Sequence, residues 1–230
     1  MSHAATRRLA PRTGLPDDVA DHLRDLIVSG QVRAGEFLRL ESLAEQLGTS
    51  VTPVREALVS LRGEGFVVLQ PRRGFVVAPF TKQDILDVYQ VQAYLAGELA
   101  ARACVALEPD ALDRLHTIQL ELEAAHHRER AEEVERLNHE FHRAINVTAG
   151  APKLAQFLAT AARYSPRLFY AQIAGWTQAS AVDHDVILTA LGEGHPQKAR
   201  AAMTDHVSKA GALLADHLQS QGLWNDEESR

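Results

Sequence analysis

Three histidines occupy positions that the surrounding pattern reserves for apolar side chains. His142, His184 and His206 each share a helix face with hydrophobic residues, and Asn138 lies one turn before His142 on the same face. Neutral imidazole is a good ligand for Zn²⁺, Ni²⁺ and similar ions, and a metal site with an open position needs three protein ligands. The side-chain carbonyl of Asn138 would be a weak additional ligand. These four residues are therefore candidate metal ligands.

Two other interpretations of these histidines stay open. A single inward histidine is most often a core residue whose nitrogens are satisfied by hydrogen bonds, although three on three helices favour a shared site. A metal with an open position could also activate water, which makes a metalloenzyme a second hypothesis. Against an enzyme, no general base stands out beside the histidines, and the N-terminal part of the chain would have no role.

Residues 49–58 have the features of a helix that reads DNA. Ser50 can cap the first turn, and Pro53 falls inside that turn, where a missing N–H is tolerated. Leucines anchor one face, while Thr52 and Arg55 point outward from another. Hydroxyl and guanidinium groups on such a helix suit insertion into a DNA major groove. The alternative is an ordinary amphipathic helix with an exposed arginine.

The flanking sequence favours DNA binding. Apolar periodicity predicts helices over residues 16–29, 40–47 and 50–62, with a turn or short strand over 32–38. Two β-rich runs, 66–70 and 75–77, then enclose a turn that carries Arg72, Arg73 and Gly74. Three helices followed by a hairpin with a basic tip is the order of a winged helix-turn-helix, whose wing contacts a minor groove or a phosphate.

From residue 83 onward the pattern is helical only. Predicted helices cover residues 83–106, 108–128, 131–149, 151–163, 166–174, 178–192 and 195–220. We therefore expect a mostly α protein with an N-terminal winged helix-turn-helix and a C-terminal all-α bundle. The expected division is a flexible arm (1–15), a DNA-binding domain (16–79), a helical domain (80–222) and a tail (223–230).

Charge and composition fit two separate tasks. Residues 1–80 hold 10 basic and 9 acidic side chains, whereas residues 81–230 hold 14 and 21, which together give the net charge of −6. The near-neutral first part can approach phosphates, and the acidic second part would be repelled by them. The chain has no apolar run that could span a membrane, and its single cysteine, Cys104, excludes an internal disulfide. We expect a cytoplasmic protein.

Both parts of the chain contain stretches that resemble a known family. Residues 47–58, Leu-Gly-Thr-Ser-Val-Thr-Pro-Val-Arg-Glu-Ala-Leu, with the Pro-Arg-Arg-Gly turn at 71–74, resemble the GntR-family winged-helix domain. Phe141-His142, Asp183-His184 and the Met-Thr-Asp-His run at 203–206 resemble the all-helical FCD effector domain of the FadR subfamily, in its VanR-like branch. The resemblance implies a homodimeric transcription factor, usually a repressor, that binds a palindromic operator in double-stranded DNA. It also implies that a small organic acid, often beside a metal such as Zn²⁺ or Ni²⁺, changes DNA affinity.

The resemblance also assigns residues. It implies a DNA contact set of Arg39, Ser50, Thr52, Pro53, Arg55, Arg72, Arg73 and Gly74. Family members often have arginine where this chain has Val51, aspartate where it has Asn138, and an inward arginine where it has Gln92. The candidate effector residues are Gln92 and three arginines that could replace the missing one, Arg143, Arg163 and Arg167. A winged helix that contacts another protein is a third hypothesis for the N-terminal part.

Overall fold

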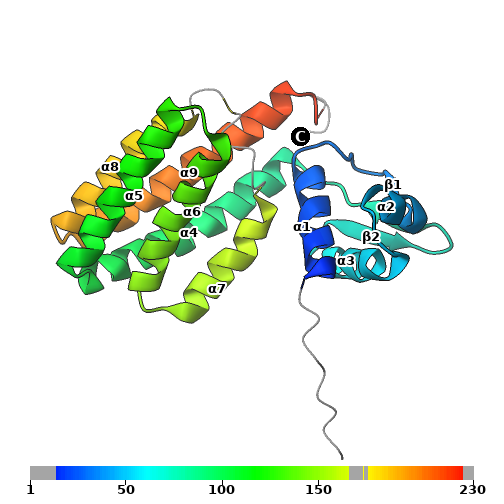
Figure 1. Ribbon diagram of the computed structural model, residues 1–230, viewed down its shortest axis with the longest axis horizontal. Coiled ribbons are helices and arrows are strands. Elements are labelled where there is room, and N and C mark those ends of the chain that lie inside the picture. Colours follow the sequence, from blue (N-terminus) through cyan, green and yellow to red (C-terminus); the bar gives the residue numbers. More distant parts are fainter. Residues whose placement is uncertain (1–13, 166–172, 174–175, 225–230) are drawn as a thin grey trace, which may run out of the picture. The chain divides into compact units, whose positions relative to one another are not determined.

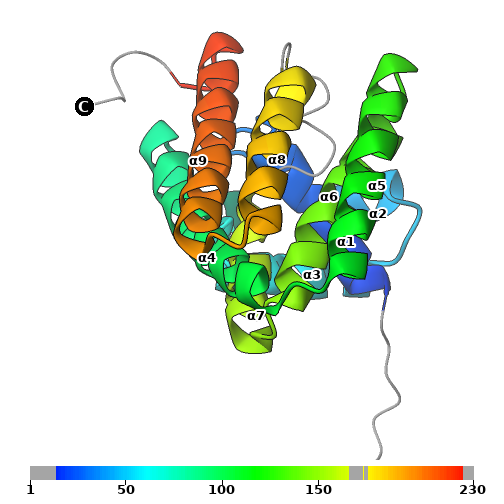
Figure 2. The ribbon, with the colours of Figure 1, turned by 90° about the vertical axis from the view of Figure 1, so that its left-hand side faces the viewer.

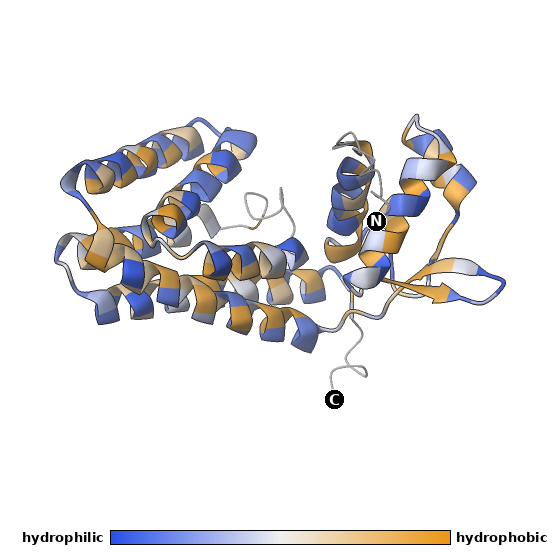
Figure 3. Cartoon of the chain, turned by 90° about the horizontal axis from the view of Figure 1, so that it is seen from below, coloured by the Kyte–Doolittle hydropathy of each residue, from blue (hydrophilic) through white to orange (hydrophobic). Residues whose placement is uncertain are grey.

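The computed structural model describes residues 14–165, 173 and 176–224 (Figure 1). The chain divides into two compact units, one formed by the residues up to 27 and 31–79, the other by 28–30 and the residues from 80 onward. The helices of both units are amphipathic, because each carries both hydrophilic and hydrophobic residues (Figure 3). No helix among the described residues is long and apolar enough to cross a membrane.

The first unit is a winged helix-turn-helix. Its helices are α1 (Leu15–Val28), α2 (Leu40–Gln46) and α3 (Val51–Gly63), and its strands are β1 (Phe37–Leu38), β2 (Val67–Gln70) and β3 (Gly74–Val77). The strands form an antiparallel sheet in the order β1-β3-β2. Leu23, Leu58 and Leu61 are completely buried in its core. The predicted fold class is confirmed here, and the segment 32–38 contains a strand of only two residues.

The wing is the β2–β3 hairpin. Gln70 pairs with Gly74, so residues 71–73 form the tip. Arg72 adopts a φ of 64° and Gly74 a φ of 95°. A left-handed conformation suits glycine and is unusual for arginine, so the tight turn itself holds Arg72 outward at the tip.

The second unit is an all-helical bundle (Figure 2). Its elements are α4 (Lys82–Ala106), α5 (Pro109–His127), α6 (Ala131–Thr148), α7 (Pro152–Ala161), the short 3₁₀ helix η1 (Ala162–Tyr164), α8 (Trp176–Gly192) and α9 (Pro196–Ser220). Helices α4 and α9 approach closely at two glycines. A Cβ on Gly97 would collide with Oγ1 of Thr204, and one on Gly211 would collide with the ring of Tyr89. Larger side chains there would push the two helices apart.

The predicted helices of the bundle are present with small differences at their ends. The helix expected over 151–163 ends at Ala161 and continues as η1 to Tyr164. Helix α8 begins at Trp176, before the expected residue 178. The helix predicted over 166–174 falls almost entirely outside the described residues.

Candidate functional site

The three predicted histidines come together inside the bundle. His142 lies on α6, His184 on α8 and His206 on α9, and their potential ligand nitrogens all lie within 4.8 Å of one another. Nε2 of His142 is 3.2 Å from Nε2 of His206. Such convergence from three helices brings three possible nitrogen ligands within reach of one ion, as a metal site requires.

His184 is held by a partner that the sequence analysis did not identify. Its Nδ1 lies 2.8 Å from Oε1 of Gln119 on α5, and the amide of Gln119 in turn donates to Glu123. The amide carbonyl accepts the Nδ1 proton, so the lone pair is on Nε2, where the hydroxyl of Ser180 lies 3.4 Å away. The ring of Phe141 stacks on His184 at a centroid distance of 4.1 Å. The sequence does contain a sign that Gln119 is buried, because it interrupts an apolar row that includes Leu115 and Leu122.

His206 is oriented by a carboxylate. Its Nδ1 lies 3.5 Å from Oδ2 of Asp183, whose other oxygen accepts from Lys209 at 2.8 Å. The hydrogen bond from His206 and the nearby Lys209 hold the pKa of Asp183 below its usual value, despite partial burial. Asp183 therefore holds the Nδ1 side of the ring, and Nε2 faces Nε2 of His142.

Burial favours the neutral form of His142 and His184. Removal from water, followed by the neighbouring imidazoles of His206 and His139, lowers the pKa of His142 to about 3. Burial, followed by repulsion from His206 and His142, also lowers the pKa of His184 well below its usual value. Metal binding needs unprotonated imidazole, so these two residues do not lose a proton when a metal binds at neutral pH.

The side chain of Asn138 shows whether the residues around the histidines fit a metal ion. Its Oδ1 is buried and has no hydrogen-bond partner among the described residues. A buried carbonyl oxygen without a partner is costly, and a cation beside it would satisfy it. Three imidazole nitrogens and one amide oxygen fit a borderline divalent ion such as Zn²⁺ or Ni²⁺. Because Asn138 contributes no negative charge, the set attracts a cation less strongly than one with a carboxylate there.

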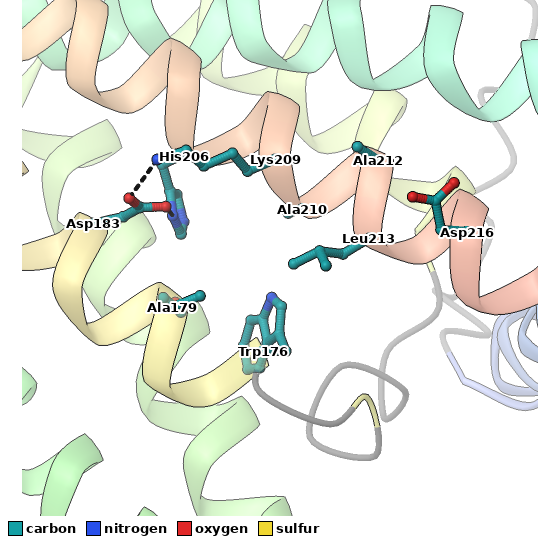
Figure 4. Close-up of a pocket in the computed structure, with 10 residues that line it drawn as sticks. Trp176, Ala179, Asp183, His206, Lys209, Ala210, Ala212, Leu213 and Asp216 are labelled. Atoms are coloured by element: carbon teal, nitrogen blue, oxygen red, sulfur yellow. Dashed lines mark hydrogen bonds and ion pairs between the residues drawn. The ribbon is translucent and has the colours of Figure 1, made fainter.

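A cavity of about 350 Å³ lies between α8 and α9 and reaches the cluster at His206 (Figure 4). Trp176, Ala179, Ser180, Asp183, His206, Lys209, Ala210, Ala212, Leu213 and Asp216 line it. Trp176 and Leu213 give it an apolar wall, and Asp183 with Lys209 forms a polar end. This volume and mixture of side chains suit a small ligand.

The predicted effector residues do not gather at this cavity. Gln92 is buried, as expected, but its amide donates to the carbonyl of Ala161 at 3.1 Å and to Ser165 at 3.2 Å, so it ties α4 to the end of α7 and η1. Arg143 and Arg163 are exposed, and neither lines the cavity. The expectation that one of these two replaces an inward arginine therefore needs correction. Arg167 lies outside the described residues.

The first unit presents its own candidate surface. Thr52 and Arg55 are exposed on α3, whereas Pro53 is buried and therefore acts through the geometry of the first turn. Ser50 stands at the N-cap position, but its side chain makes no capping hydrogen bond, so the expected cap is absent. Arg39 before α2 and Arg72 and Arg73 at the wing tip are also exposed.

An arginine that the sequence analysis missed supports α3. Arg24 of α1 is buried, and its guanidinium donates twice to Oε2 of Glu64, at 3.0 and 2.9 Å, just after α3 ends. It also lies over the ring of Phe66. This contact fixes the end of α3 against α1.

Comparisons with known proteins give a family match for each of the two units. The model of the family described as bacterial regulatory proteins, gntR family, matches residues 15–77, and the FCD domain model matches residues 87–209. The Escherichia coli regulator McbR is 29% identical over 153 residues, which cover 66% of this chain and 69% of that protein. The E. coli repressor GlaR is 31% identical over 139 residues, which cover 58% of this chain and 63% of that protein. The solved structure of E. coli McbR/YncC matches with a TM-score of 0.69 and 25% identity over 89% of this chain and 99% of that one.

Proposed function

Since this chain belongs to the gntR family of bacterial regulatory proteins and carries an FCD domain, we propose that it is a ligand-responsive repressor. A small molecule that binds beside the histidine cluster changes its affinity for operator DNA. Proteins of this family are transcription regulators that bind DNA and effectors and act as dimers, which sets aside the metalloenzyme hypothesis. The observation that carries the proposal is the convergence of His142, His184 and His206 beside the cavity.

The metal would be held by these three histidines and by Oδ1 of Asn138. A bound divalent ion supplies a Lewis-acidic position for an oxygen of the effector. The protein contributes orientation, since Gln119 and Asp183 hold the Nδ1 sides of two of the rings.

The effector is a small organic acid with an apolar part. The cations near the cavity are already compensated, because Lys209 pairs with Asp183 and Asp205, and Lys82 pairs with Asp216. An acidic group is therefore best placed at the metal, while Trp176 and Leu213 contact the apolar part of the ligand. Binding there would bias the arrangement of the two DNA-reading heads of a dimer.

In the first unit, Arg55 and Thr52 read base edges and the wing arginines contact phosphates. A bidentate pair between arginine and guanine discriminates by about 1–3 kcal/mol. Arg72 and Arg73 contribute affinity that depends on salt more than on sequence.

The metal part is tested by calorimetric titration of the chelator-treated chain with Zn²⁺ and Ni²⁺. We expect stoichiometric binding, a raised melting temperature, and loss of both in His142→Ala. The matched control is His139→Ala, which removes an exposed histidine from the same helix and leaves binding intact. Binding that survives His142→Ala would remove this residue from the site.

The regulatory part is tested with small organic acids. A thermal-shift screen of the metal-loaded chain identifies ligands, because a ligand bound only by the folded state raises its stability, by about 2.7 kcal/mol at 100 times Kd. An operator shift assay then measures DNA affinity with and without each hit. A hit that binds the chain and leaves operator affinity unchanged would contradict its role as effector.

A further inference from the structure

We propose that Leu223 and Trp224, which follow α9, form a clamp that holds the connections between the two units and passes changes in α9 on to them. We call these two residues the C-terminal clamp. The inference rests on the proposed function only for what the clamp transmits, because the contacts that form it need neither ligand nor DNA.

The end of α9 turns the clamp back onto the bundle. Gly222 adopts a φ of 73°, and its N–H donates to the carbonyl of Gln219 at 2.9 Å. The N–H of Leu223 donates to the carbonyl of Leu218 at 3.1 Å. This pair of hydrogen bonds is a Schellman motif, in which a glycine in the left-handed conformation ends the helix. The clamp is therefore attached to α9 by backbone hydrogen bonds and follows its movements.

The clamp lies where the chain changes from one unit to the other. The chain makes this change after residues 27, 30 and 79. A Cβ on Gly30 would collide with the side chain of Leu223, so Leu223 lies directly against the backbone there. Nε1 of Trp224 donates to the carbonyl of Phe80 at 2.6 Å. Gly30 and Phe80 both belong to the same unit as α9, and each adjoins a residue of the DNA-reading unit.

Burial makes the contact of Trp224 specific. Its side chain is 8% exposed and lies in the core of the bundle, against which Phe80 and Leu223 also pack. An indole N–H can only donate, and a buried donor without an acceptor is costly. Phe80 precedes Thr81, the N-cap residue of α4, so its carbonyl lies in the connection itself. The indole therefore fixes the connecting backbone as well as filling space.

Helix α9 joins the clamp to the proposed effector site. It carries His206 of the histidine cluster and two residues of the cavity wall, Leu213 and Asp216, and it continues to Ser220. Asp216 also accepts from Lys82, two residues after Phe80, at 2.8 Å. A ligand that shifts α9 would therefore shift the clamp, because the helix is continuous between them. The clamp would then change how the connections to the DNA-reading unit are held.

The first experiment compares two shortened chains with the full chain by hydrogen exchange and mass spectrometry. One ends after Gly222 and lacks the clamp, and the other ends after Trp224 and is the matched control. Without the clamp, amide exchange at residues 28–30 and 80–82 should be at least about 10-fold faster, while exchange in α5 and α6 stays within about twofold. The control should exchange like the full chain. Unchanged exchange at both segments, or equal acceleration across the whole bundle, would overturn the clamp.

The second experiment tests transmission with Zn²⁺ as the ligand. Trp224→Phe removes the indole N–H and keeps an aromatic ring in the core. Operator affinity is measured for the chelator-treated and the Zn²⁺-loaded chain. The two affinities should differ about 5-fold or more in the wild type and less than about twofold in Trp224→Phe. Leu120→Ala, at a position of α5 that is 66% exposed, is the control and should respond like the wild type.

Zn²⁺ affinity and melting temperature are measured for each variant. Trp224→Phe should bind Zn²⁺ within about twofold of the wild type, because it leaves the histidine cluster intact. A full operator response to Zn²⁺ in Trp224→Phe would overturn the transmitting role. A wild-type operator affinity that does not respond to Zn²⁺ would contradict a regulatory role of the metal in the proposed function. The exchange experiment, which uses neither metal nor DNA, then decides the clamp by itself.

Discussion

Nδ1 of His184 lies 2.8 Å from Oε1 of Gln119, although the two residues are 65 positions apart in the chain. The amide carbonyl accepts the Nδ1 proton and leaves Nε2 free of one. Because His184 is completely buried, no solvent molecule can replace this acceptor without a structural change. Gln119 therefore sets which nitrogen of His184 is available at the histidine cluster.

Replacing this acceptor should weaken both stability and metal binding. In Gln119→Leu the buried Nδ1 proton has no partner, which costs about 1–3 kcal/mol of unfolding free energy in the metal-free chain. Zn²⁺ affinity should fall about 10- to 100-fold because the ring is no longer oriented. Urea unfolding and calorimetry measure the two effects, with Gln90→Leu, at an exposed position of α4, as the control. Unchanged Zn²⁺ affinity would show that Gln119 does not orient the ring for a metal.

A substitution of Asn138 should strengthen metal binding. In Asn138→Asp a carboxylate replaces the unpartnered carbonyl oxygen one turn before His142. Zn²⁺ affinity should rise about 10-fold or more, whereas the metal-free chain should lose stability because a carboxylate is buried at a position without a hydrogen-bond donor. Asn146→Asp, further along α6, is the control for an added charge. If the metal affinity of the two variants is the same, Oδ1 of Asn138 does not contact the metal.

The metal-free chain should lose stability on acidification. The folded-state pKa of His142 is lowered to about 3 and that of His184 is also lowered, whereas in the unfolded chain both are near 6.5. Between these values the unfolded state binds more protons, so stability is fully present above about pH 6.5 and decreases as pH falls toward 3. The slope is at most about 1.4 kcal/mol per pH unit for each histidine.

Chemical denaturation at pH 7.5 and 5.5, in the presence of a chelator, measures this dependence. His142→Gln removes one of the two titrating groups and should reduce the slope by about half. A wild-type stability that stays constant over this range would mean that the histidines are protonated as easily in the folded chain as in the unfolded one.

Arg55 should carry sequence discrimination. Arg55→Ala is expected to weaken operator binding by about 1–3 kcal/mol and to leave binding to unrelated DNA nearly unchanged. Arg62→Ala, in the last turn of the same helix, changes charge equally and should affect both DNAs alike. Fluorescence anisotropy with the two DNAs provides the comparison, and equal losses on both would identify Arg55 as a phosphate contact.

The wing arginines should determine part of the salt dependence of DNA binding. For the double variant Arg72→Ala/Arg73→Ala, the slope of log K against log salt should become shallower by about 1.8, because two phosphate contacts are lost. Binding measured from low to moderate salt gives the slope for the wild type and the variant. If the slope is unchanged while specificity falls, the wing reads bases.

Much of this protein follows from the sequence alone, because the relevant interactions are local. The apolar periodicity and the turn at 71–74 are sufficient to predict the three helices and the hairpin of the first unit. The same periodicity places His142, His184 and His206 on inward faces, and their convergence then follows from the bundle. Arg55 points outward because a helix fixes the direction of each side chain relative to its anchored face.

The tertiary structure decided what depends on distant partners. Periodicity cannot show that Gln119 accepts from His184, that Asp183 orients His206, or that Asn138 lacks a hydrogen-bond partner, because these relations depend on the packing of different helices. It also cannot show that Arg143 lies outside the cavity or that Leu223 and Trp224 contact Gly30 and Phe80. A sequence pattern determines which face of a helix is apolar, and only packing determines what lies against that face.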